Sequence, residues 1–437
     1  MPQDVLVIPS ARRMMESLRD IGYDLPAAVA DLVDNALDAM ATCIDVDLHW
    51  DGEDSWLRVT DNGMGMTAAR LDEAMRYGSA RDYEANALGR FGLGLKTASL
   101  SQCRVLSVAS RTDASGRPEA RRWDLDRVGE LDQWSLERLA ISDAPEALIA
   151  PIRHVRGTVV MWERLDRVVG YKLPGGVAAE HGFAVTAAEI AAHLGMVFHR
   201  FLDGSARRRR RLRIRVNEQG LEAWDPFCCS EKATRRLPQQ SLALRHGARQ
   251  HRITVSPFVL PNQHQFSSQR AREIASGPLR WNRQQGFYIY RRDRLIQSGG
   301  WNRLRTTDEH TKLARIAVDI PPAADDAFEV NVAKMHLLLP SELRAPMKTI
   351  ASGVAQFAQE VYRGGRPDWQ DQRPVEVAHL PGVAVHSRPR IGWSAVERVL
   401  RRELVRNPAM CDRILAALIV ESHAAGEAKA LSSAAKR

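Results

Sequence analysis

The residues of this chain best suited to chemistry start at Asp61, which follows an alternating, strand-like run over residues 55–60. An ionised carboxylate only accepts hydrogen bonds, so Asp61 could receive the exocyclic amine of a planar base such as adenine. Gly63 and Gly65 have no Cβ, so a ring could lie against their bare backbone. Taken alone, Asp-Asn-Gly is most simply an ordinary turn. Two further stretches, one on each side, favour the ligand-binding interpretation.

The upstream stretch is an acidic helix. Residues 25–40 have helical periodicity, with apolar side chains on one face and polar ones on the other, namely Asp31, Asp34, Asn35 and Asp38. From Asp20 to Leu57 the chain has ten acidic residues and no Lys or Arg, so the helix lacks the i,i+4 ion pairs of an ordinary solvated face. A solvated face remains the alternative. Because aligned carboxylates repel one another, the pattern predicts a bound cation, and oxygen ligands suit Mg²⁺ shared with phosphate.

The downstream stretch is a glycine-rich turn, Gly89 to Gly94, which runs into a helix-like segment beginning at Leu95. Backbone N–H groups at a helix N-terminus bind phosphate, and Lys96 would add a cation beside them. The turn lacks the Gly-Lys-Ser/Thr ending of a Walker loop, and no strand and crossover follow it as in a dinucleotide-binding unit. It therefore predicts a phosphate site of another kind.

These three stretches, each about 25 residues from the next, resemble the GHKL ATPase superfamily, which contains gyrase, the ninety-kilodalton heat-shock chaperone, histidine kinases and MutL. The run Gly157 to Trp162 is similar to the strand that closes the adenine pocket in that superfamily. The resemblance implies an α+β protein whose N-terminal domain is a Bergerat-type α/β sandwich, with ATP and Mg²⁺ as cofactors. The polar residues 77–88, which precede the glycine turn, would form the ATP lid.

The resemblance also implies roles for individual residues. Asn35 would hold Mg²⁺, Asp61 would read the adenine amine, and Thr158 would contact the base through water. The remaining nucleotide contacts would come from Gly63, Gly65, Met66, Gly89, Phe91, Gly92, Leu93, Gly94 and Lys96. The general base, usually Glu in this superfamily, falls on Asp31, whose side chain is one methylene shorter. Because a base must reach the attacking water, we expect ATP hydrolysis to be slow.

Charge is unevenly distributed along the chain. Residues 1–100 carry 9 Lys and Arg against 17 Asp and Glu, a net charge of −8, so the remainder of this chain of net +9 carries +17. Nucleic acid is the usual partner of such a basic region. Five consecutive arginines, Arg207 to Arg211, would form either a solvated loop or phosphate contacts that weaken with salt.

A second resemblance lies further along the chain. A strand at residues 286–290, a basic turn, the tripeptide Arg294-Leu295-Ile296 and, later, Val330-Asn331-Val332 with Lys334 are similar to the S5-like transducer domain of MutL and MORC proteins. The resemblance implies that Lys334 reaches the γ-phosphate and acts as a catalytic residue from the second domain. A surface lysine at a strand end is the alternative. A cation in that place would couple the nucleotide state to the angle between domains.

We therefore expect three regions: an ATP-binding domain over residues 1–170, a smaller α/β transducer-like domain over 171–342, and a helical C-terminal region over 343–437. Four prolines mark residues 364–389 as a linker within the last region. No apolar run is long enough to span a bilayer, and the first ten residues lack the pattern of a signal peptide. We expect a cytoplasmic protein without a membrane partner, and five cysteines without metal-ligand spacing fit a reducing compartment.

The expected function is an ATP-driven conformational switch. ATP would order the lid, pair two N-terminal domains into a homodimer, and clamp DNA or a DNA-associated complex, with partner proteins, in repair, chromosome organisation or phage defence. The alternative is a heat-shock-type chaperone ATPase that acts on protein clients. A phosphotransfer kinase is disfavoured because only about 20 residues precede the ATP domain, where histidine kinases keep their phosphoacceptor helices. The short Asp31 also leaves open a nucleotide sensor without catalysis.

Overall fold

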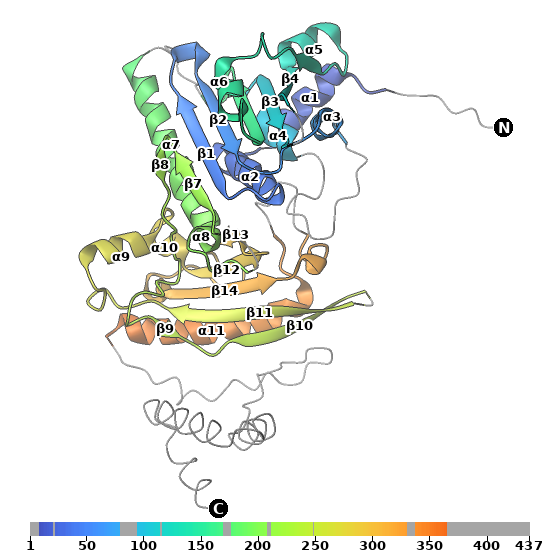
Figure 1. Cartoon of the computed structure of the whole chain (residues 1–437). Helices are drawn as coiled ribbons and strands as arrows, with labels where there is room; N and C mark the ends of the chain where they lie inside the picture. Colours follow the sequence, from blue (N-terminus) through green and yellow to red (C-terminus); the bar gives the residue numbers. More distant parts are fainter. Residues whose placement is uncertain are drawn as a thin grey trace, which may run out of the picture. The chain divides into compact units, whose positions relative to one another are not determined.

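The computed structural model describes residues 8–20, 22–78, 94–113, 116–168, 176–207, 211–247, 249–329 and 337–364. All of them lie within one compact unit, Met1–Val385. In this part of the chain, two β-sheets each pack against helices, so the architecture is α+β and its N-terminal part is an α/β sandwich (Figure 1). None of the described helices combines the length and apolar character needed to cross a membrane.

The first sheet belongs to the N-terminal half of the chain. Within the described residues it has eight strands in the order β5-β4-β3-β6-β2-β1-β7-β8. In chain order these are β1 Cys43–His49, β2 Trp56–Asp61, β3 Val105–Arg111, β4 Glu119–Asp124, β5 Glu137–Leu139, β6 Gly157–Glu163, β7 Arg213–Val216 and β8 Gln219–Gly220. β1 and β2 form an antiparallel hairpin, with Val46 opposite Val59. Every second residue of these two strands is buried, as the alternating sequence predicts.

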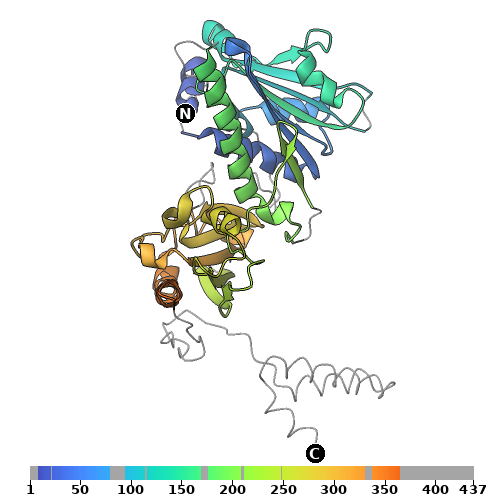
Figure 2. The same ribbon diagram turned by 90° about the vertical axis from the view of Figure 1, so that its left-hand side faces the viewer.

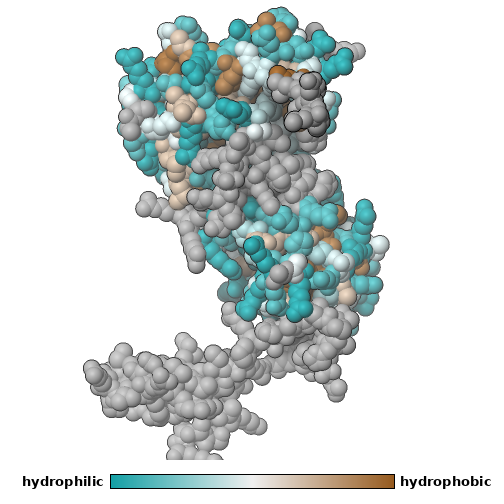
Figure 3. All heavy atoms as spheres, turned by 90° about the vertical axis from the view of Figure 1, so that its right-hand side faces the viewer, coloured by the Kyte–Doolittle hydropathy of each residue, from teal (hydrophilic) through white to brown (hydrophobic). Residues whose placement is uncertain are grey.

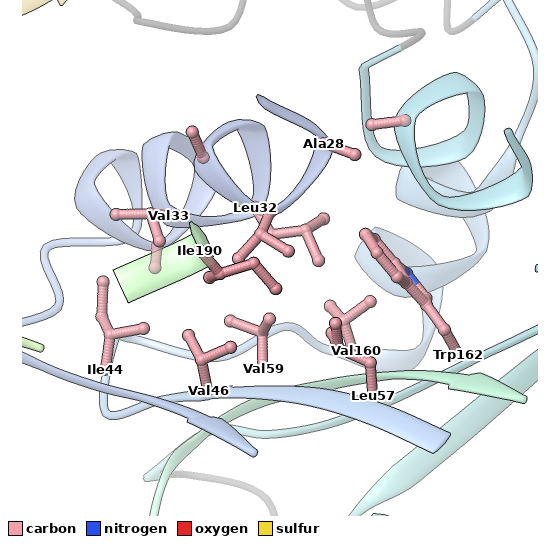
Figure 4. Close-up of a cluster of buried hydrophobic side chains, with 14 of the residues drawn as sticks. Ala28, Leu32, Val33, Ile44, Val46, Leu57, Val59, Val160, Trp162 and Ile190 are labelled. Carbon is pink, nitrogen blue, oxygen red and sulfur yellow. The ribbon is translucent and has the colours of Figure 1, made fainter. Parts of the chain in front are cut away.

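Helices pack on both faces of the first sheet. They are α1 Ala11–Arg19, α2 Leu25–Asp38, α3 Ala68–Met75, α4 Gly94–Leu100, α5 Leu125–Leu131, α6 Glu146–Ile149, α7 Val177–Val197 and α8 His199–Leu202, with the 3₁₀ turns η1 Gly52–Asp54 and η2 Ala150–Ile152. The larger core lies under α2, where Leu32 and Val33 point toward Val46 and Val59 of the sheet (Figure 4). A smaller core under α6 and η2 covers part of the opposite face.

Helix α2 begins where the sequence predicts. The Asp24 side chain accepts a hydrogen bond from the Ala27 N–H at 2.8 Å, and a proline occupies the first turn. The helix ends at Asp38, and Met40 then takes a left-handed φ of 63°. The apolar face predicted for residues 25–40 is confirmed in its middle, at residues 28–36, but Met40 is 65% exposed. On the predicted polar face, Asp31 and Asp34 are buried as well.

The second sheet comes from residues 235–320. Within the described residues it has six strands, in the order β10-β11-β14-β12-β13, with β9 paired to β11. These are β9 Arg235–Arg236, β10 Gln240–His246, β11 Arg249–Val259, β12 Gly286–Arg291, β13 Arg294–Ser298 and β14 Ala314–Ile320. The accompanying helices are α9 Gln269–Ser276, α10 Arg280–Gln284 and α11 Ser341–Tyr362, with the 3₁₀ turns η3 Glu309–Thr311 and η4 Pro322–Ala324.

Helix α11 covers the beginning of the region, residues 343–437, that the sequence predicts to be helical. Its buried stripe of Met347, Ile350 and Val354 packs in the same core as Ile253 and Val255 of β11. The basic turn between β12 and β13 is tight, because Arg292 and Asp293 both take left-handed φ values, of 51° and 68°. This turn directs Arg294 back toward the first sheet, where its contacts are described below.

The expected domain boundary at residue 170 does not coincide with the end of the first sheet. β7, expected in the second domain, pairs in parallel with β1, with Ile214 opposite Ile44. Helix α7 begins at Val177, packs against α2, and also contacts β13. Figure 2 shows this long green helix running from the first sheet toward the second. The alternation Arg-Ile-Arg-Val identifies a strand but carries no information on its partner, so the sequence alone could not place it.

Several predicted features lie outside the described residues. They are the lid from residue 79 onward, the turn from Gly89 to Leu93, Arg208 to Arg210, the segment from Val330 to Lys334, and the linker and helices beyond Gly364. Phe328 and Glu329, directly before Val330, form a turn.

Candidate nucleotide-binding site

Asp61 lies at the end of β2, where the first sheet presents backbone from three strands. It pairs with Thr158 of β6 on one side and with Ile44 of β1 on the other. Its Oδ1 accepts a hydrogen bond from the Gly63 N–H at 2.7 Å. Burial raises the pKa of Asp61 to about 6, against the lowering effect of the backbone N–H groups of Gly63 and Thr158. At neutral pH the group is therefore a carboxylate in a poorly hydrated place, which favours a ligand that donates to it.

Thr158 is the second polar residue at this end of the sheet. It is buried, and its Oγ1 lies 2.9 Å from the Oγ of Ser110 on the adjacent strand β3. The Ser110 hydroxyl donates to the Gly157 carbonyl at 3.0 Å and accepts from the Met66 N–H at 2.8 Å. Ser110 thus links Thr158 to the turn that follows Asp61. Sequence reasoning missed Ser110, because only the pairing of β3 with β6 places it opposite Thr158.

Glycines are required here by backbone packing. Gly65 has a φ of 69°, and a Cβ on it would lie 1.9 Å from the carbonyl oxygen of Arg111. A Cβ on Gly63 would lie 2.7 Å from the carbonyl oxygen of Ala39. The space beside both glycines is filled by the chain itself, which brings the turn after β2 against the end of α2. The predicted contact of these glycines with a base stays a prediction.

The other end of the candidate site is Asp31 on α2. The residue is 3% exposed, and its Oδ2 accepts a hydrogen bond from the Tyr23 hydroxyl at 3.0 Å. Burial, and then the Asp31 charge, raise the pKa of Tyr23 well above its usual range, so the phenol stays protonated and donates. The first residue of α4, Gly94, faces this carboxylate, since a Cβ on Gly94 would lie 3.7 Å from Oδ2. The predicted base therefore lies beside the end of the predicted phosphate turn.

One face of α2 joins the two ends. Asp31, Asn35 and Ala39 are spaced by four residues, so they follow one another along a single helix face. Asp31 lies beside Gly94, and the Ala39 carbonyl accepts from the Met64 N–H at 2.9 Å, next to Gly63. Asn35 is exposed between them. The predicted magnesium ligand thus lies between the predicted base-binding and phosphate-binding residues.

Lys96 is placed differently from the expectation of an ammonium group beside phosphate. It is 2% exposed, and its Nζ donates to the Ala74 carbonyl at 2.9 Å and lies 6.0 Å from the centre of the Tyr77 ring. Burial lowers the pKa of Lys96 to about 8. In this structure the side chain ties α4 to the C-terminal end of α3, directly before the segment predicted to be the lid.

The acidic stripe of α2 has cationic partners that the sequence around it did not reveal. Asp34, 0% exposed, accepts from Arg294 Nε at 2.9 Å, and Asp38 lies 4.0 Å from Arg292. Arg292 lies in the turn before β13 and Arg294 is the first residue of β13, about 260 residues later in the chain. Repulsion within the stripe therefore does not by itself require Mg²⁺. Asp31 and Asn35 are the oxygen donors of the stripe that lie on the face toward Gly94 and Gly63.

The oxygen donors fit a magnesium ion only if a nucleotide supplies most of its ligands. Among the described residues no group of three or more His, Cys, Asp or Glu side chains could hold a metal ion. Mg²⁺ commonly takes one or two protein oxygens and fills its shell with phosphate and water. The exposed amide of Asn35 suits that role. Gly89, Phe91, Gly92, Leu93 and Lys334, the other predicted phosphate contacts, lie outside the described residues.

Two comparisons with known proteins found matches. Residues 23–153 match the family model described as histidine kinase-, DNA gyrase B- and HSP90-like ATPase. A segment of 93 residues is 40% identical to the DNA mismatch repair protein MutL of Beijerinckia indica subsp. indica. The aligned segment covers 20% of this chain and 14% of that relative.

Proposed function

Since residues 23–153 match the GHKL ATPase superfamily and a 93-residue segment of the chain is 40% identical to a MutL protein, we propose that this chain is an ATP-binding and ATP-hydrolysing conformational switch that acts on DNA. The observation that supports it best is the single face of α2 described above. That face has Asp31 and Gly94 at one end and Gly63, next to Asp61, at the other. An elongated ligand with a base and a chain of phosphates matches this order.

In this proposal Asp61 accepts the exocyclic amine of adenine. A carboxylate whose pKa is about 6 when no ligand is present benefits most from a donor that restores the hydrogen bonds removed by burial. The Ser110 hydroxyl would orient the Thr158 hydroxyl, which would contact the adenine ring through water. Gly94 and the turn before it would contribute N–H groups to the phosphates, and Asn35 would hold Mg²⁺. A bound magnesium ion would supply positive charge to the phosphates.

Asp31 is proposed as the general base that orients and deprotonates the attacking water. Its hydrogen bond from Tyr23 holds the carboxylate near Gly94. The side chain is one methylene shorter than Glu, so its reach into the phosphate region is smaller and turnover should be slow. Lys334 is proposed to contact the γ-phosphate from the second sheet region.

DNA is proposed as the client because of a basic stretch on the second sheet. Residues 232–272 contain eight Lys and Arg and no Asp or Glu. The β10–β11 hairpin lies within this stretch, and its Arg245, Arg249 and Arg252 are exposed. In Figure 1 this hairpin ends on the right-hand side of the view. Seen from that side, the surface of the described residues is mainly hydrophilic (Figure 3). Such an excess of cations favours a polyanion whose phosphates follow one another in a line.

The nucleotide proposal is tested by calorimetric binding of ATP–Mg²⁺ to the full chain and to two variants, Asp61→Asn and Asn35→Ala. We expect the affinity of both for ATP–Mg²⁺ to fall at least tenfold. Asp45→Asn is a matched control, since Asp45 is a carboxylate of the same sheet that pairs with Arg215 at 2.6 Å. If both site variants bind as tightly as the wild type, the proposal is wrong.

The DNA proposal is tested by titrating duplex DNA at several salt concentrations. The logarithm of the DNA association constant falls as the logarithm of the salt concentration rises, and each arginine that binds a phosphate makes this slope steeper by about 0.9. Removal of one such arginine should make the slope shallower by the same amount. The double variant Arg249→Gln/Arg252→Gln should show this, whereas Arg138→Gln/Arg164→Gln, which removes two exposed arginines of the first sheet region, should not. If the wild-type protein shows no salt-dependent binding of DNA, the result favours the alternative function, a chaperone-type ATPase that acts on protein clients.

ATP-gated dimerisation is a separate part of the proposal. Sedimentation of the full chain with a non-hydrolysable ATP analogue should show a dimer, and sedimentation with ADP a monomer. The same species with both nucleotides would contradict the gating.

A further inference from the structure

Arg294, the first residue of β13, links the second sheet to the candidate nucleotide site. Its Nε lies 3.2 and 2.9 Å from the two carboxylate oxygens of Asp34. One of its terminal nitrogens lies 3.9 Å from Oδ1 of Asp31. The side chains of Arg294, Asp31 and Asp34 are 5%, 4% and 0% exposed. One guanidinium from the second sheet therefore contacts both buried carboxylates of α2.

Asp31 is held from two directions. Its Oδ2 accepts from the Tyr23 hydroxyl at 3.0 Å, and its Oδ1 faces Arg294. The phenol belongs to the first sheet region, whereas the guanidinium belongs to the second. The orientation of the carboxylate beside Gly94 is thus determined jointly by both parts of the protein.

A buried carboxylate without a cation is strongly disfavoured, and two of them separated by three residues on one helix also repel each other. The planar fork of an arginine can contact two carboxylates in fixed directions, which a lysine ammonium group, as a point charge, cannot do equally well. Arg294 also donates to the Leu295 carbonyl at 3.2 Å, so its own geometry is anchored to β13. Movement of β13 relative to α2 must therefore displace the guanidinium from Asp31.

We propose that Arg294 is a positioning residue for ATP hydrolysis, which orients Asp31 only while the second sheet is docked on α2. The inference rests on the proposed ATPase function and adds a regulation to it. Hydrolysis would depend on the position of the second sheet region, and by linkage the nucleotide state would bias that position. This coupling is distinct from the one predicted for Lys334, which would contact the phosphate itself.

The test uses the full chain and compares Arg294→Leu, Arg294→Lys and a control, Arg200→Leu. Arg200 makes another half-buried ion pair of the same region, with Asp319 at 2.5 Å and Asp293 at 3.3 Å, and within the described part of the chain both of these partners lie outside α2. Arg294→Leu should lower kcat at least tenfold, with the Kd for a non-hydrolysable ATP analogue changed less than threefold. Arg294→Lys should recover part of kcat, and Arg200→Leu should leave kcat within threefold of the wild type.

A double-mutant cycle shows whether the effect passes through Asp31. In the Asp31→Asn background, Arg294→Leu should reduce the residual kcat no further. Without nucleotide, the drop in melting temperature of Asp31→Asn/Arg294→Leu should be smaller than the two single drops added together. If Arg294→Leu does not fold, Asp34→Asn/Arg294→Leu, which leaves no unpaired charge at Asp34, replaces it in the kinetic comparison.

The inference is overturned if Arg294→Leu and Arg200→Leu lower kcat equally, or if the two losses at positions 31 and 294 multiply in kcat and add in melting temperature. Wild-type protein that binds no ATP would refute the proposed function instead. The two failures are therefore distinguished by the wild-type binding measurement.

Discussion

Replacing Asp61 by Asn should stabilise the nucleotide-free protein while it removes ATP binding. Burial raises the pKa of Asp61 from its ordinary value of 3.8 to about 6. Because the folded-state value lies above the unfolded one, the carboxyl opposes folding progressively as pH rises from about 4 to 6. Above pH 6 the full penalty applies, and it is roughly 3 kcal/mol at 1.36 kcal/mol per pKa unit.

The substitution keeps the shape of the side chain and an oxygen that can accept from the Gly63 N–H. It removes the buried charge, so the unfolding free energy at pH 7.5 should rise by about 1–3 kcal/mol, the upper value being the whole penalty. At pH 5 the gain should fall to roughly half, because the wild-type carboxyl is then mostly protonated in the folded state. Urea unfolding of nucleotide-free protein at the two pH values measures both quantities.

Asp126→Asn is a control in which the unfolding free energy should change in the opposite direction. A hydrogen bond from Arg104 holds the pKa of Asp126 below its ordinary value, so this carboxylate favours folding above pH 4, and its loss should destabilise the protein at pH 7.5. If Asp61→Asn is less stable than the wild type at pH 7.5, or if its stability advantage does not shrink at pH 5, burial of the Asp61 charge does not destabilise the folded protein.

Three further predictions concern the same site. Gly65→Ala should lower the unfolding free energy by at least the roughly 1–2 kcal/mol of a left-handed residue, because its Cβ would also collide with the Arg111 carbonyl; Gly116→Ala, with open space around it, should be neutral in the same urea assay. Ser110→Ala should cost about 1–3 kcal/mol in unfolding free energy and weaken ATP binding measured by calorimetry, because the Met66 N–H loses its acceptor; an unchanged affinity would show that this linkage does not support the base. Asp31→Glu should raise the steady-state rate of phosphate release with little change in ATP affinity, and an unchanged or lower rate would show that reach does not limit turnover.

Local patterns predicted the parts of the fold that depend on neighbouring residues. The apolar stripe of α2, the β1–β2 hairpin and the long helix α11 follow from periodicity that each segment carries itself. The order of Asp31, Asn35 and Ala39 along one helix face is fixed by the same periodicity. These features place Asp31, Asn35 and the turn after β2 along one helix face, and the nucleotide site predicted there stays a prediction.

Features that depend on distant partners could not be predicted in this way. Asp34 pairs with Arg294, 260 residues further along the chain, so the local charge pattern around α2 overstated the need for a bound cation. Ser110 reads as an ordinary strand residue until β3 is paired with β6. Lys96 lies next to a glycine turn in sequence, but burial and the carbonyl at the end of α3 determine where its ammonium group points.

The return of the chain to β1 after α7 sets the smallest portion of this protein that could be studied alone. A fragment cut at residue 170 would strip β7 from β1 and leave a bare strand edge, with Ile44 and Val46 deprived of the α7 residues packed in the same core. Exposed edges of this kind invite pairing between molecules. A recombinant N-terminal piece should therefore extend past Gly220, and shorter pieces should precipitate during purification.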